Sequence, residues 1–402
     1  MILLLALLPP LYATDHNAAT CSQANVASAI SASSAGDRVL VPAGTCSWSG
    51  NISFSGIQVI GAGSDPSTGT IITTGAATLT KHASEYTRIS GFRFTGTARH
   101  VSIGGTASNK MAIIDHCYLF TNGGDGSSTM LGITVNGVLV HNNQFVATTA
   151  TSADVFNILT SEDWSAAQTM GTADTTGERN IYFEDNTFLN ILETAPDGDE
   201  GGRYVFRHNT WTDSSLVFHS GGPVNDTSQA GHRHFEIYDN TFVRVSNSVA
   251  VNKWVWARGG TGVIANNAMD RADSPDGFSF PNKPEIELGI GCESGSYPIP
   301  FQIGQVTNTE NPPSHPMLIF GNTGAGTGDA NFISVGGNNT GPSGHTCSTP
   351  GTFVQVNRDY YLSNQWGWTP YTYPHPLQSL GEGSPVSPRR ISGATRIFGR
   401  IQ

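Results

Sequence analysis

A short pattern that recurs through the middle of the chain constrains the fold more than any other feature of the sequence. It comprises two apolar residues two positions apart, a small polar residue, an asparagine and, two positions further on, an aromatic residue. The clearest copies are Val138–Phe145, Ile181–Phe188, Tyr204–Trp211 and Phe235–Phe242, with weaker copies around Asn267 and Asn322, while Cys117 and Phe92 hold the asparagine position upstream. Successive positions are separated by 25, 26, 43, 23, 31, 27 and 55 residues. Self-similarity at this period is typical of a solenoid.

The pattern predicts coils that stack in parallel. Apolar residues two apart point to the same side of a strand, and asparagine tolerates the left-handed conformation that bends a chain between strands. Asparagines stacked at the inter-strand spacing of about 4.8 Å hydrogen-bond to one another. We therefore predict an all-β fold, a single-stranded parallel β-helix. The separations of 43 and 55 fit either one coil with an inserted loop or two coils, one of which has lost the pattern.

Composition and charge narrow the class of ligand. Charged residues make up only 13% of the chain and glycine accounts for 47 residues, which suits an all-β protein with many turns. The formal net charge is −11, with 20 Lys and Arg against 31 Asp and Glu. Nucleic acid is therefore excluded as the main ligand, because phosphate binding needs a basic footprint. A local basic cluster would still bind an acidic polysaccharide.

The N-terminal residues 1–13 are an apolar run that ends in a small residue and resembles a secretory signal peptide. The alternative interpretation is an apolar strand of the fold. The run is too short for a stable transmembrane span. We expect a secreted or cell-surface protein, with residues 1–20 as leader, 21–377 as the β-helix domain, and 378–402 as a Gly/Pro/Ser linker and basic tail.

Two disulfides, Cys21–Cys46 and Cys292–Cys347, would fit an exported protein. Cys117 remains, and its place in an interior column predicts a buried free thiol without a redox role. No spacing of Cys and His in the sequence is typical of a structural zinc site.

Segments near the N-terminus resemble a known superfamily. A helix expected over Asn25–Ser33 is followed by Gly36-Asp-Arg-Val-Leu-Val-Pro-Ala-Gly-Thr45, and Ile57–Gly63 and Thr87–Phe94 continue in the same style. This resembles the opening of pectate-lyase-like β-helices, and the resemblance covers about residues 24–377. It implies a right-handed parallel β-helix with an N-terminal capping helix and lateral loops. It matches no catalytic family, so function must be argued from the site.

Positions two, four and six before the asparagine should point outward and stack from coil to coil. Over the coils of Asn186, Asn209 and Asn240 they gather a polar and aromatic set, which we call the polar column: Tyr182, Glu184, Arg203, Arg207, His234, Glu236 and Tyr238. One coil earlier, His141 holds the same position as Glu184. Tyrosine stacks on sugar faces, and Arg and Glu bind hydroxyl or carboxylate groups, so the column predicts a polysaccharide-binding face. Alternatively, Glu184–Arg207 and Arg203–Glu236 are simple cross-strand ion pairs.

Two further features flank this face. His219 ends an expected strand that begins at Leu216. The segment from Lys253 to Arg258 alternates basic and aromatic residues and contains Trp254 and Trp256. Two tryptophans with flanking cations are typical of a sugar platform, although tryptophan is equally common in β-sheet cores.

The residue types allow two reactions. In β-elimination from a uronate, Arg207, His219, His234, Lys253 and Arg258 are candidate bases or carboxylate-neutralising groups, and Tyr238 is a candidate acid. In hydrolysis, the candidate pairs of carboxylates are Glu184 with Glu236, or either of them with Asp185 or Asp239. The acidic segment Asp197-Gly-Asp-Glu200 is a candidate Ca²⁺ site or, alternatively, a solvated turn.

These features favour a secreted protein that cleaves an extended polysaccharide, with lyase chemistry preferred to hydrolysis. The alternative is a non-catalytic β-helix at the cell surface: a glycan-binding adhesin, a phage-spike-like element or a structural solenoid. That alternative predicts polar column residues that are paired with one another and no cleft between them. The sugar, the linkage and the oligomeric state stay open.

Overall fold

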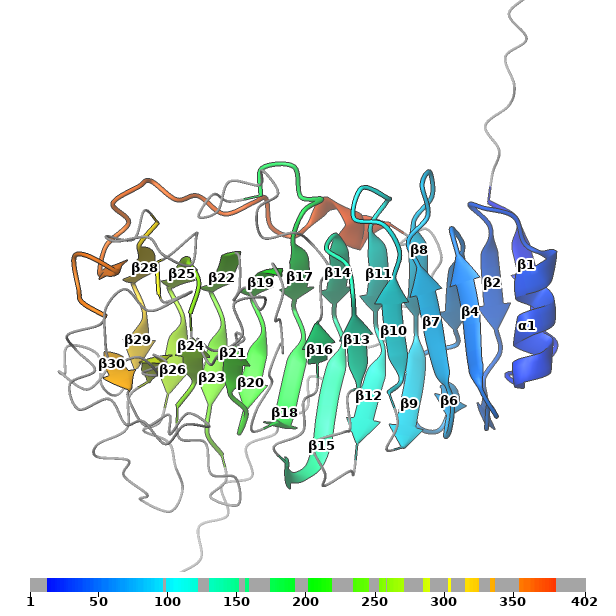
Figure 1. Ribbon diagram of the computed structural model, residues 1–402. Coiled ribbons are helices and arrows are strands. Elements are labelled where there is room, and N and C mark those ends of the chain that lie inside the picture. Colours follow the sequence, from blue (N-terminus) through cyan, green and yellow to red (C-terminus); the bar gives the residue numbers. More distant parts are fainter. Residues whose placement is uncertain are drawn as a thin grey trace, which may run out of the picture.

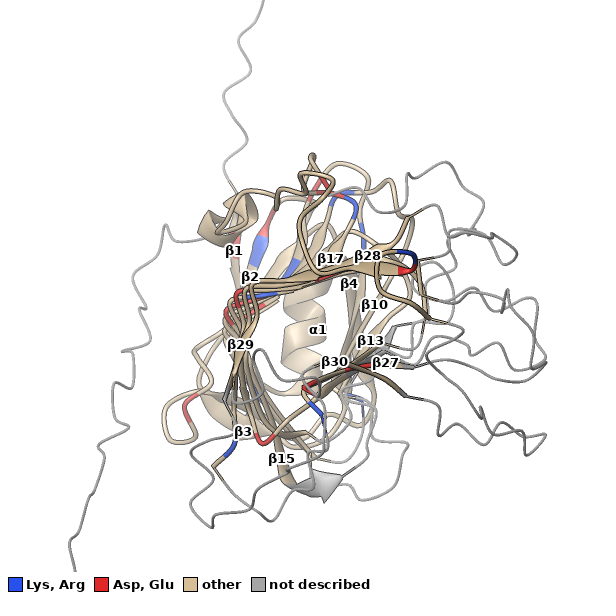
Figure 2. Cartoon of the chain, turned by 90° about the vertical axis from the view of Figure 1, so that its left-hand side faces the viewer, with Lys and Arg blue, Asp and Glu red and all other residues tan. Residues whose placement is uncertain are grey.

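The protein is described from a computed structural model. It describes residues 13–96, 99–121, 130–151, 156–158, 174–191, 202–218, 234–245, 253–257, 259–270, 285–289, 303–304, 315–324, 333–336 and 354–380. Within these ranges the chain winds through short strands that pair in parallel from one coil to the next (Figure 1). The view along the stack shows these strands forming walls around a common interior (Figure 2).

The longest wall is a twelve-stranded sheet, and it holds the strands that precede each asparagine. Its strands in order are β1 (Asp15–Asn17), β2 (Arg38–Val41), β5 (Gln58–Gly61), β8 (Thr87–Ser90), β11 (Ala112–Asp115), β14 (Val138–His141), β17 (Ile181–Glu184), β19 (Arg203–Arg207), β22 (His234–Tyr238), β25 (Gly262–Ala265), β28 (Met317–Phe320) and β31 (Tyr360–Tyr361). This parallel order confirms that the repeats stack coil on coil.

The second wall is a ten-stranded sheet made of the strands that follow each turn. Its members are β3 (Gly44–Cys46), β6 (Thr70–Ile72), β9 (Phe92–Gly96), β12 (Tyr118–Thr121), β15 (Gln144–Thr151), β18 (Thr187–Ile191), β20 (Thr210–Thr212), β23 (Thr241–Val243), β26 (Ala268–Asp270) and β29 (Thr323–Gly324). Each strand pairs with its counterpart one coil away, so the aromatic residue of one repeat lies beside that of the next.

The third strand of a coil belongs to one of two smaller sheets. A five-stranded sheet comprises β4 (Asn51–Ser55), β7 (Ala76–Thr80), β10 (Val101–Gly104), β13 (Leu131–Ile133) and β16 (Phe156–Ile158). A four-stranded sheet comprises β21 (Leu216–Phe218), β24 (Val255–Ala257), β27 (Ile286–Gly289) and β30 (Ile333–Gly336). These sheets complete the enclosure of a long, thin core.

The interior is filled by columns of aromatic side chains, as the repeat predicts. The rings of Phe145 and Phe188 are 5.0 Å apart, those of Phe188 and Trp211 3.8 Å, and those of Trp211 and Phe242 5.6 Å. All four are fully buried. Stacked aromatic pairs add to the stability that their burial already provides.

Beside the aromatic column runs a ladder of buried asparagines. The Nδ2 of Asn186 donates to the Oδ1 of Asn209 at 3.1 Å, and the same oxygen accepts the backbone N–H of Asn186 at 3.0 Å. The same pair of bonds recurs at each step from Asn143 to Asn322. Because β14 pairs with β17 and β25 with β28, the separations of 43 and 55 residues each span one coil.

The bend itself lies one residue earlier than predicted. Positive φ angles of 53–57° occur at Asn142, Asp185, His208, Asp239 and Asn266, each directly before a ladder asparagine. The prediction that the ladder asparagine adopts the left-handed conformation was therefore wrong. The asparagine is needed for its inward amide, so the neighbouring position takes the residue types that tolerate a positive φ.

The N-terminal end carries the one α-helix of the described residues, α1 (Gln23–Ala32), beside β1 and β2 (Figure 1). Ser22 begins the helix by accepting the N–H of Asn25 at 3.4 Å, and Val26 and Ala29 pack into the core. Residues 15–17, which the sequence placed in a leader, form β1 and pair with β2.

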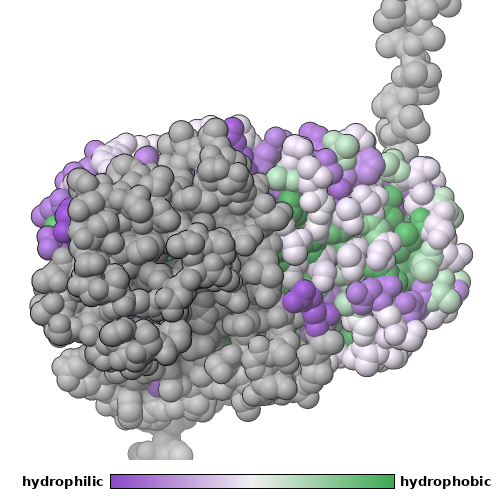
Figure 3. Space-filling view, viewed as in Figure 1, coloured by the Kyte–Doolittle hydropathy of each residue, from purple (hydrophilic) through white to green (hydrophobic). Residues whose placement is uncertain are grey.

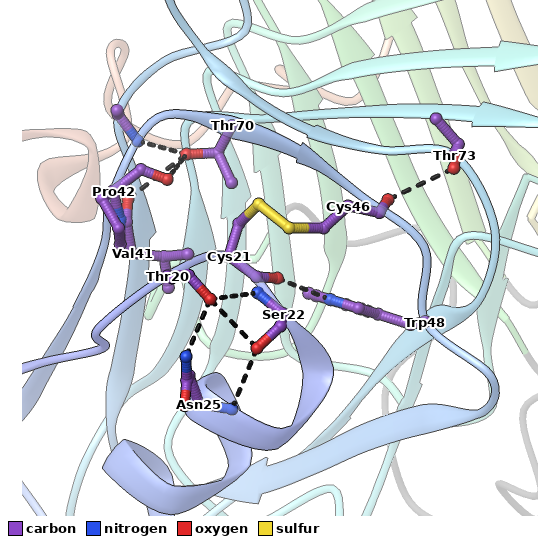
Figure 4. The surroundings of a disulfide bond; sticks show 11 residues. Thr20, Cys21, Ser22, Asn25, Val41, Pro42, Cys46, Trp48, Thr70 and Thr73 are labelled. Carbon is purple, nitrogen blue, oxygen red and sulfur yellow. Dashed lines mark hydrogen bonds between the residues drawn. A yellow bond between two sulfur atoms is a disulfide. The ribbon is translucent and has the colours of Figure 1, made fainter.

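The disulfide Cys21–Cys46 is confirmed and ties the start of α1 to β3, with Cα atoms 5.8 Å apart (Figure 4). The indole N–H of Trp48 donates to the carbonyl of Cys21 at 2.9 Å, also drawn there. Cys117 is a buried free thiol, as predicted. The predicted partners Cys292 and Cys347 lie outside the described residues.

Candidate functional site

The outer face of the twelve-stranded sheet is covered by the chain's own C-terminal part. After β31, residues 362–380, which we call the strap, run back along this face and end near β14 in a short 3₁₀ helix, η2 (Pro376–Ser379) (Figure 1, orange to red). Trp368 lies against Tyr238 and Phe320, with ring centroids 5.1 and 6.2 Å apart. The sheet is therefore buried on both faces over these coils.

Beneath the strap is a second apolar cluster, separate from the main core. It contains Met111, Ile113, Leu139, Tyr182, Val205, Tyr238, Val263, Ala265 and Leu318, with Trp368, Tyr371, Leu377 and Leu380 of the strap packed against it. Apart from Met111, which directly precedes β11, the sheet residues of this cluster are the outward positions of consecutive strands. The strap thus removes from solvent an apolar surface that the solenoid cannot bury internally.

An ion pair between Arg207 and Glu184 lies at the centre of this interface, and both side chains are fully buried. The Nε of Arg207 donates to Glu184 Oε1 at 2.7 Å. Its Nη1 donates to the hydroxyl of Tyr238 at 2.7 Å and to the carbonyl of Tyr371 at 2.6 Å, while Nη2 donates to the carbonyl of Thr372 at 2.9 Å. The predicted cross-strand pair is confirmed, and the guanidinium also holds two strap carbonyls.

The second oxygen of Glu184 also binds the strap. Oε2 accepts the backbone N–H of His375 at 3.0 Å and the side-chain amide of Gln378 at 2.7 Å. Burial raises the pKa of Glu184 in spite of the neighbouring Arg207. Burial likewise raises the pKa of the Tyr238 and Tyr182 hydroxyls, so neither phenol ionises near neutral pH.

The remaining polar column residues are also paired and buried. His234 Nε2 lies 2.8 Å from Glu236 Oε1, and burial lowers the pKa of this histidine. Arg203 Nε donates to Asn180 Oδ1 at 2.9 Å, and the hydroxyl of Tyr182 donates to Asp174 at 3.2 Å.

The register of the polar column is as predicted: Arg203 pairs with His234 and Arg207 with Tyr238. The polar column was also expected on an open lateral surface. The structure differs here, because each of its side chains is at most 2% exposed. The sequence pattern identified the outward direction, but the strap fills the space outside Tyr182, Glu184, Arg207 and Tyr238. These residues meet one another, and in the folded chain they do not meet solvent.

His141 belongs to a second buried cluster, around Asp115. Burial lowers the pKa of His141 to about 4. Asp115 accepts two hydrogen bonds from Arg88, both 2.6 Å, and one each from Ser90 and His116. Burial alone would raise the pKa of Asp115, but the bonds from Arg88 hold it well below its usual range. Sequence reasoning missed Arg88 and Ser90, although both lie in register with the repeat.

The Lys253 segment divides between core and surface. Trp254 is fully buried in the core, so the structure does not present it as a sugar platform. Trp256 points the other way on β24 and is partly exposed. The ammonium of Lys253 lies 3.6 Å from the centre of the Trp256 ring and 2.8 Å from the carboxylate of Glu287 on β27. The Lys253 and Glu287 side chains keep 18% and 20% of their surface exposed.

The five-stranded sheet is chemically different on its outer face. Ser53, Thr78 and Ser102 lie side by side in register there. The space-filling view over β4, β7 and β10 shows mostly weakly polar surface (Figure 3). The outer face of the four-stranded sheet differs from this one. Among the described residues of these two sheets, only the four-stranded sheet carries an aromatic ring beside charged side chains on its outer face.

Several predicted site residues lie outside the described part of the chain: His219, Arg258, Asp197, Asp199 and Glu200. The proposed Ca²⁺ site is therefore untested. Within the described ranges, no group of three or more His, Cys, Asp or Glu side chains is arranged to hold a metal ion. No described helix is long and apolar enough to cross a membrane.

The strap is part of this site, and sequence reasoning did not predict it. Its Tyr373 ring stacks on His208 at 3.5 Å and its hydroxyl donates to Asp185 at 2.6 Å. The only available signal was the aromatic and proline-rich run from Pro370 to Pro376. No protein-family model, curated protein or solved structure matches the chain.

Proposed function

We propose that this chain is an exported, carbohydrate-active protein that binds an acidic polysaccharide on the outer face of its four-stranded sheet. The observation that carries the proposal is the contact of Lys253 with Trp256 and Glu287, which joins a cation, an indole ring and a carboxylate at a partly exposed position. The Cys21–Cys46 disulfide supports export, because such bonds persist in oxidising compartments.

The chemistry of this group fits a uronate. An indole ring offers an apolar face to a sugar ring, and the lysine ammonium pairs with the sugar carboxylate. In the unbound chain Glu287 holds that ammonium, and a partly exposed ion pair of this kind contributes about 0–1 kcal/mol. A polymer carboxylate therefore replaces Glu287 at little cost.

If the bound polymer is cleaved, we propose β-elimination in preference to hydrolysis. A lysine beside a uronate carboxylate neutralises it, and this favours transfer of the neighbouring proton to a base while the bond to the glycosidic oxygen at the next carbon breaks. The candidate base of the same segment, Arg258, lies outside the described residues. Hydrolysis needs two carboxyl groups on either side of the bond. Every predicted pair includes Glu184 or Glu236, and these two are buried and bonded to Arg207 and His234.

A non-catalytic binding protein is the second candidate. Its support is the pairing of the polar column: the ionic side chains that the sequence offered as catalytic groups bind one another and the strap. That pairing is what a glycan adhesin or structural surface protein predicts. The same binding site serves both candidates, and only product formation separates them.

A finer assignment of the fold is part of the proposal. We propose a right-handed β-helix of the pectate-lyase-like kind, with α1 as its N-terminal cap. The repeated order of three strands per coil and the asparagine ladder support this assignment.

The test measures binding of polygalacturonate, alginate and a neutral glucan to the purified full chain. We expect Trp256→Ala and Lys253→Ala to weaken binding of an acidic polymer by on the order of tenfold. Lys110→Ala is the matched control, because Lys110 also lies over an aromatic ring, that of Tyr86 at 5.7 Å. Equal binding by all three variants would remove the four-stranded sheet from the proposal.

The same samples are followed for unsaturated products by ultraviolet absorbance and for new reducing ends. Absorbance and reducing ends together assign a lyase, and reducing ends alone assign a hydrolase. Binding without either product assigns the non-catalytic candidate.

A further inference from the structure

The strap is held in the way that a protein holds a separate peptide. One buried ion pair recognises its main chain: Arg207 donates to the carbonyls of Tyr371 and Thr372, and Glu184 accepts the N–H of His375. Main-chain hydrogen bonds combined with side-chain pockets are the general basis of peptide recognition. Hydrogen bonds to charged groups are also the stronger kind.

Side chains of the strap fill defined positions on the body of the solenoid. Tyr371 and Leu377 pack on the second apolar cluster, and Tyr373 stacks on His208 while its hydroxyl donates to Asp185. The Nε2 of His375 lies 2.9 Å from the carbonyl of Gly177. The strap is thus recognised along its length by alternating main-chain and side-chain contacts.

The covalent link to the solenoid contributes little to this recognition. The hydrogen bonds between strap and body join residues 164 to 198 positions apart in the chain. Between β31 and Trp368 the segment 362–366 is exposed, with Leu362 and Trp366 55% and 46% exposed. Its contacts with the body are ring contacts of Trp366, whose centroid lies 6.1 Å from that of His315 and 6.3 Å from that of Tyr361. A cut between Leu362 and Ser363 would keep Asn364, Trp366 and Trp368 together on the strap, so the contacts of the strap with the body and its internal hydrogen bonds would stay in place.

We propose that the outer face of the twelve-stranded sheet is a peptide-binding site, occupied by residues 368–380, that holds this segment without a covalent connection. The site then accepts the same segment when it is supplied by a second molecule, which is the physical basis of segment exchange between copies of a chain. Its ligand is an extended, aromatic and proline-containing peptide whose main chain pairs with Arg207 and Glu184.

The experiment uses the full chain with a protease recognition sequence inserted between Leu362 and Ser363. The folded protein is cleaved, passed through a gel-filtration column in native buffer and analysed by mass spectrometry. We expect the C-terminal fragment to remain with the body. The cleaved complex is then mixed with an excess of fluorescent synthetic peptide 366–380, and the loss of the original fragment is followed over time.

Three strap variants test which contacts hold the fragment. Tyr371→Ala and Gln378→Ala should release it faster by on the order of tenfold, because each removes a partly buried contact with the body. Ser379→Ala is the matched control, since among the described residues its hydroxyl donates to Pro376 within the strap and not to the body. All three changes lie outside the solenoid and leave its core intact.

Two results would overturn the proposal. The first is separation of the unaltered fragment from the body during gel filtration. The second is a release rate for Tyr371→Ala and Gln378→Ala equal to that of Ser379→Ala, which would mean that these contacts do not hold the segment.

Discussion

Removing one amide from the asparagine ladder should destabilise the protein far more than its small size suggests. In Asn209→Ala, the backbone N–H of Asn186 loses its acceptor at 3.0 Å, and the carbonyl of Phe183 loses its donor at 2.9 Å. Asn240 Oδ1 keeps the backbone N–H of residue 209, which donates at 3.1 Å. Each buried group left unsatisfied costs about 1–3 kcal/mol, so we expect a loss of about 3–5 kcal/mol.

The variant Asn209→Asp keeps the shape of the side chain and changes its hydrogen-bonding groups, so it tests the hydrogen bonds apart from the shape. In Asn209→Asp the new oxygen faces two acceptors, the carbonyl of Phe183 and Asn240 Oδ1. Only a protonated carboxyl can donate to them, so the folded-state pKa of this residue rises above the unfolded value of about 3.9. A group with a raised folded pKa is stabilising below the unfolded value and loses that contribution as pH increases. The destabilisation should therefore be greater at pH 7 than at pH 4.

The assay is urea unfolding at several pH values, followed by circular dichroism. Asn266→Asp is the matched control, because Asn266 is exposed at the corner position where Asp185 and Asp239 occur in other coils. We expect this control to change stability by less than about 0.5 kcal/mol. A loss below about 1 kcal/mol in Asn209→Ala, or no dependence on pH in Asn209→Asp, would refute the ladder as a stabilising element.

Three further predictions are tested by the same unfolding assay or by labelling of the free thiol. Cys21→Ser should lower the free energy of unfolding by about 2–4 kcal/mol, because the Cys21–Cys46 bond closes a loop across 25 positions; a loss under about 1 kcal/mol would contradict this. Burial raises the pKa of Cys117 to about 12, so its thiol should resist Ellman's reagent until urea unfolds the chain; rapid native labelling would show an accessible thiol. Burial lowers the pKa of His100 and of His141 to about 4, so stability should fall as pH decreases from about 6.5 towards 4. His100→Gln should flatten that slope, and an unchanged slope would exclude His100 as its source.

The stacking of the coils was predictable because each repeat contains the residues that determine it. Alternation at period two identifies the inward side chains, and the recurring asparagine fixes which strands become neighbours. The buried thiol of Cys117 follows from the same register. The left-handed residue was misplaced by one position, since asparagine suits both a bend and a ladder and the sequence does not show which role it takes.

The strap was not predictable in this way, because it does not repeat. Its contacts with Arg207 and Glu184 join residues more than 160 positions apart, and no period relates the two segments. Period-two reasoning showed that the polar column points away from the core, but burial depends on what lies outside. A column in which an arginine, a glutamate and a tyrosine are in register fits a substrate face and a covered interface equally well.

The asparagine ladder keeps neighbouring coils aligned even when the coils contain different numbers of residues. Asn143 meets Asn186 through the same amide contacts that join Asn186 to Asn209, although the first two are 43 positions apart in the sequence and the others 23. An extra twenty or so residues are thus accommodated in one coil without breaking the ladder, although the pairing of β15 with β18 in that coil carries a register shift between Val146 and Thr151. A lineage carrying this scaffold can vary its lateral surface freely, since the cost of lengthening a loop grows only slowly with its size.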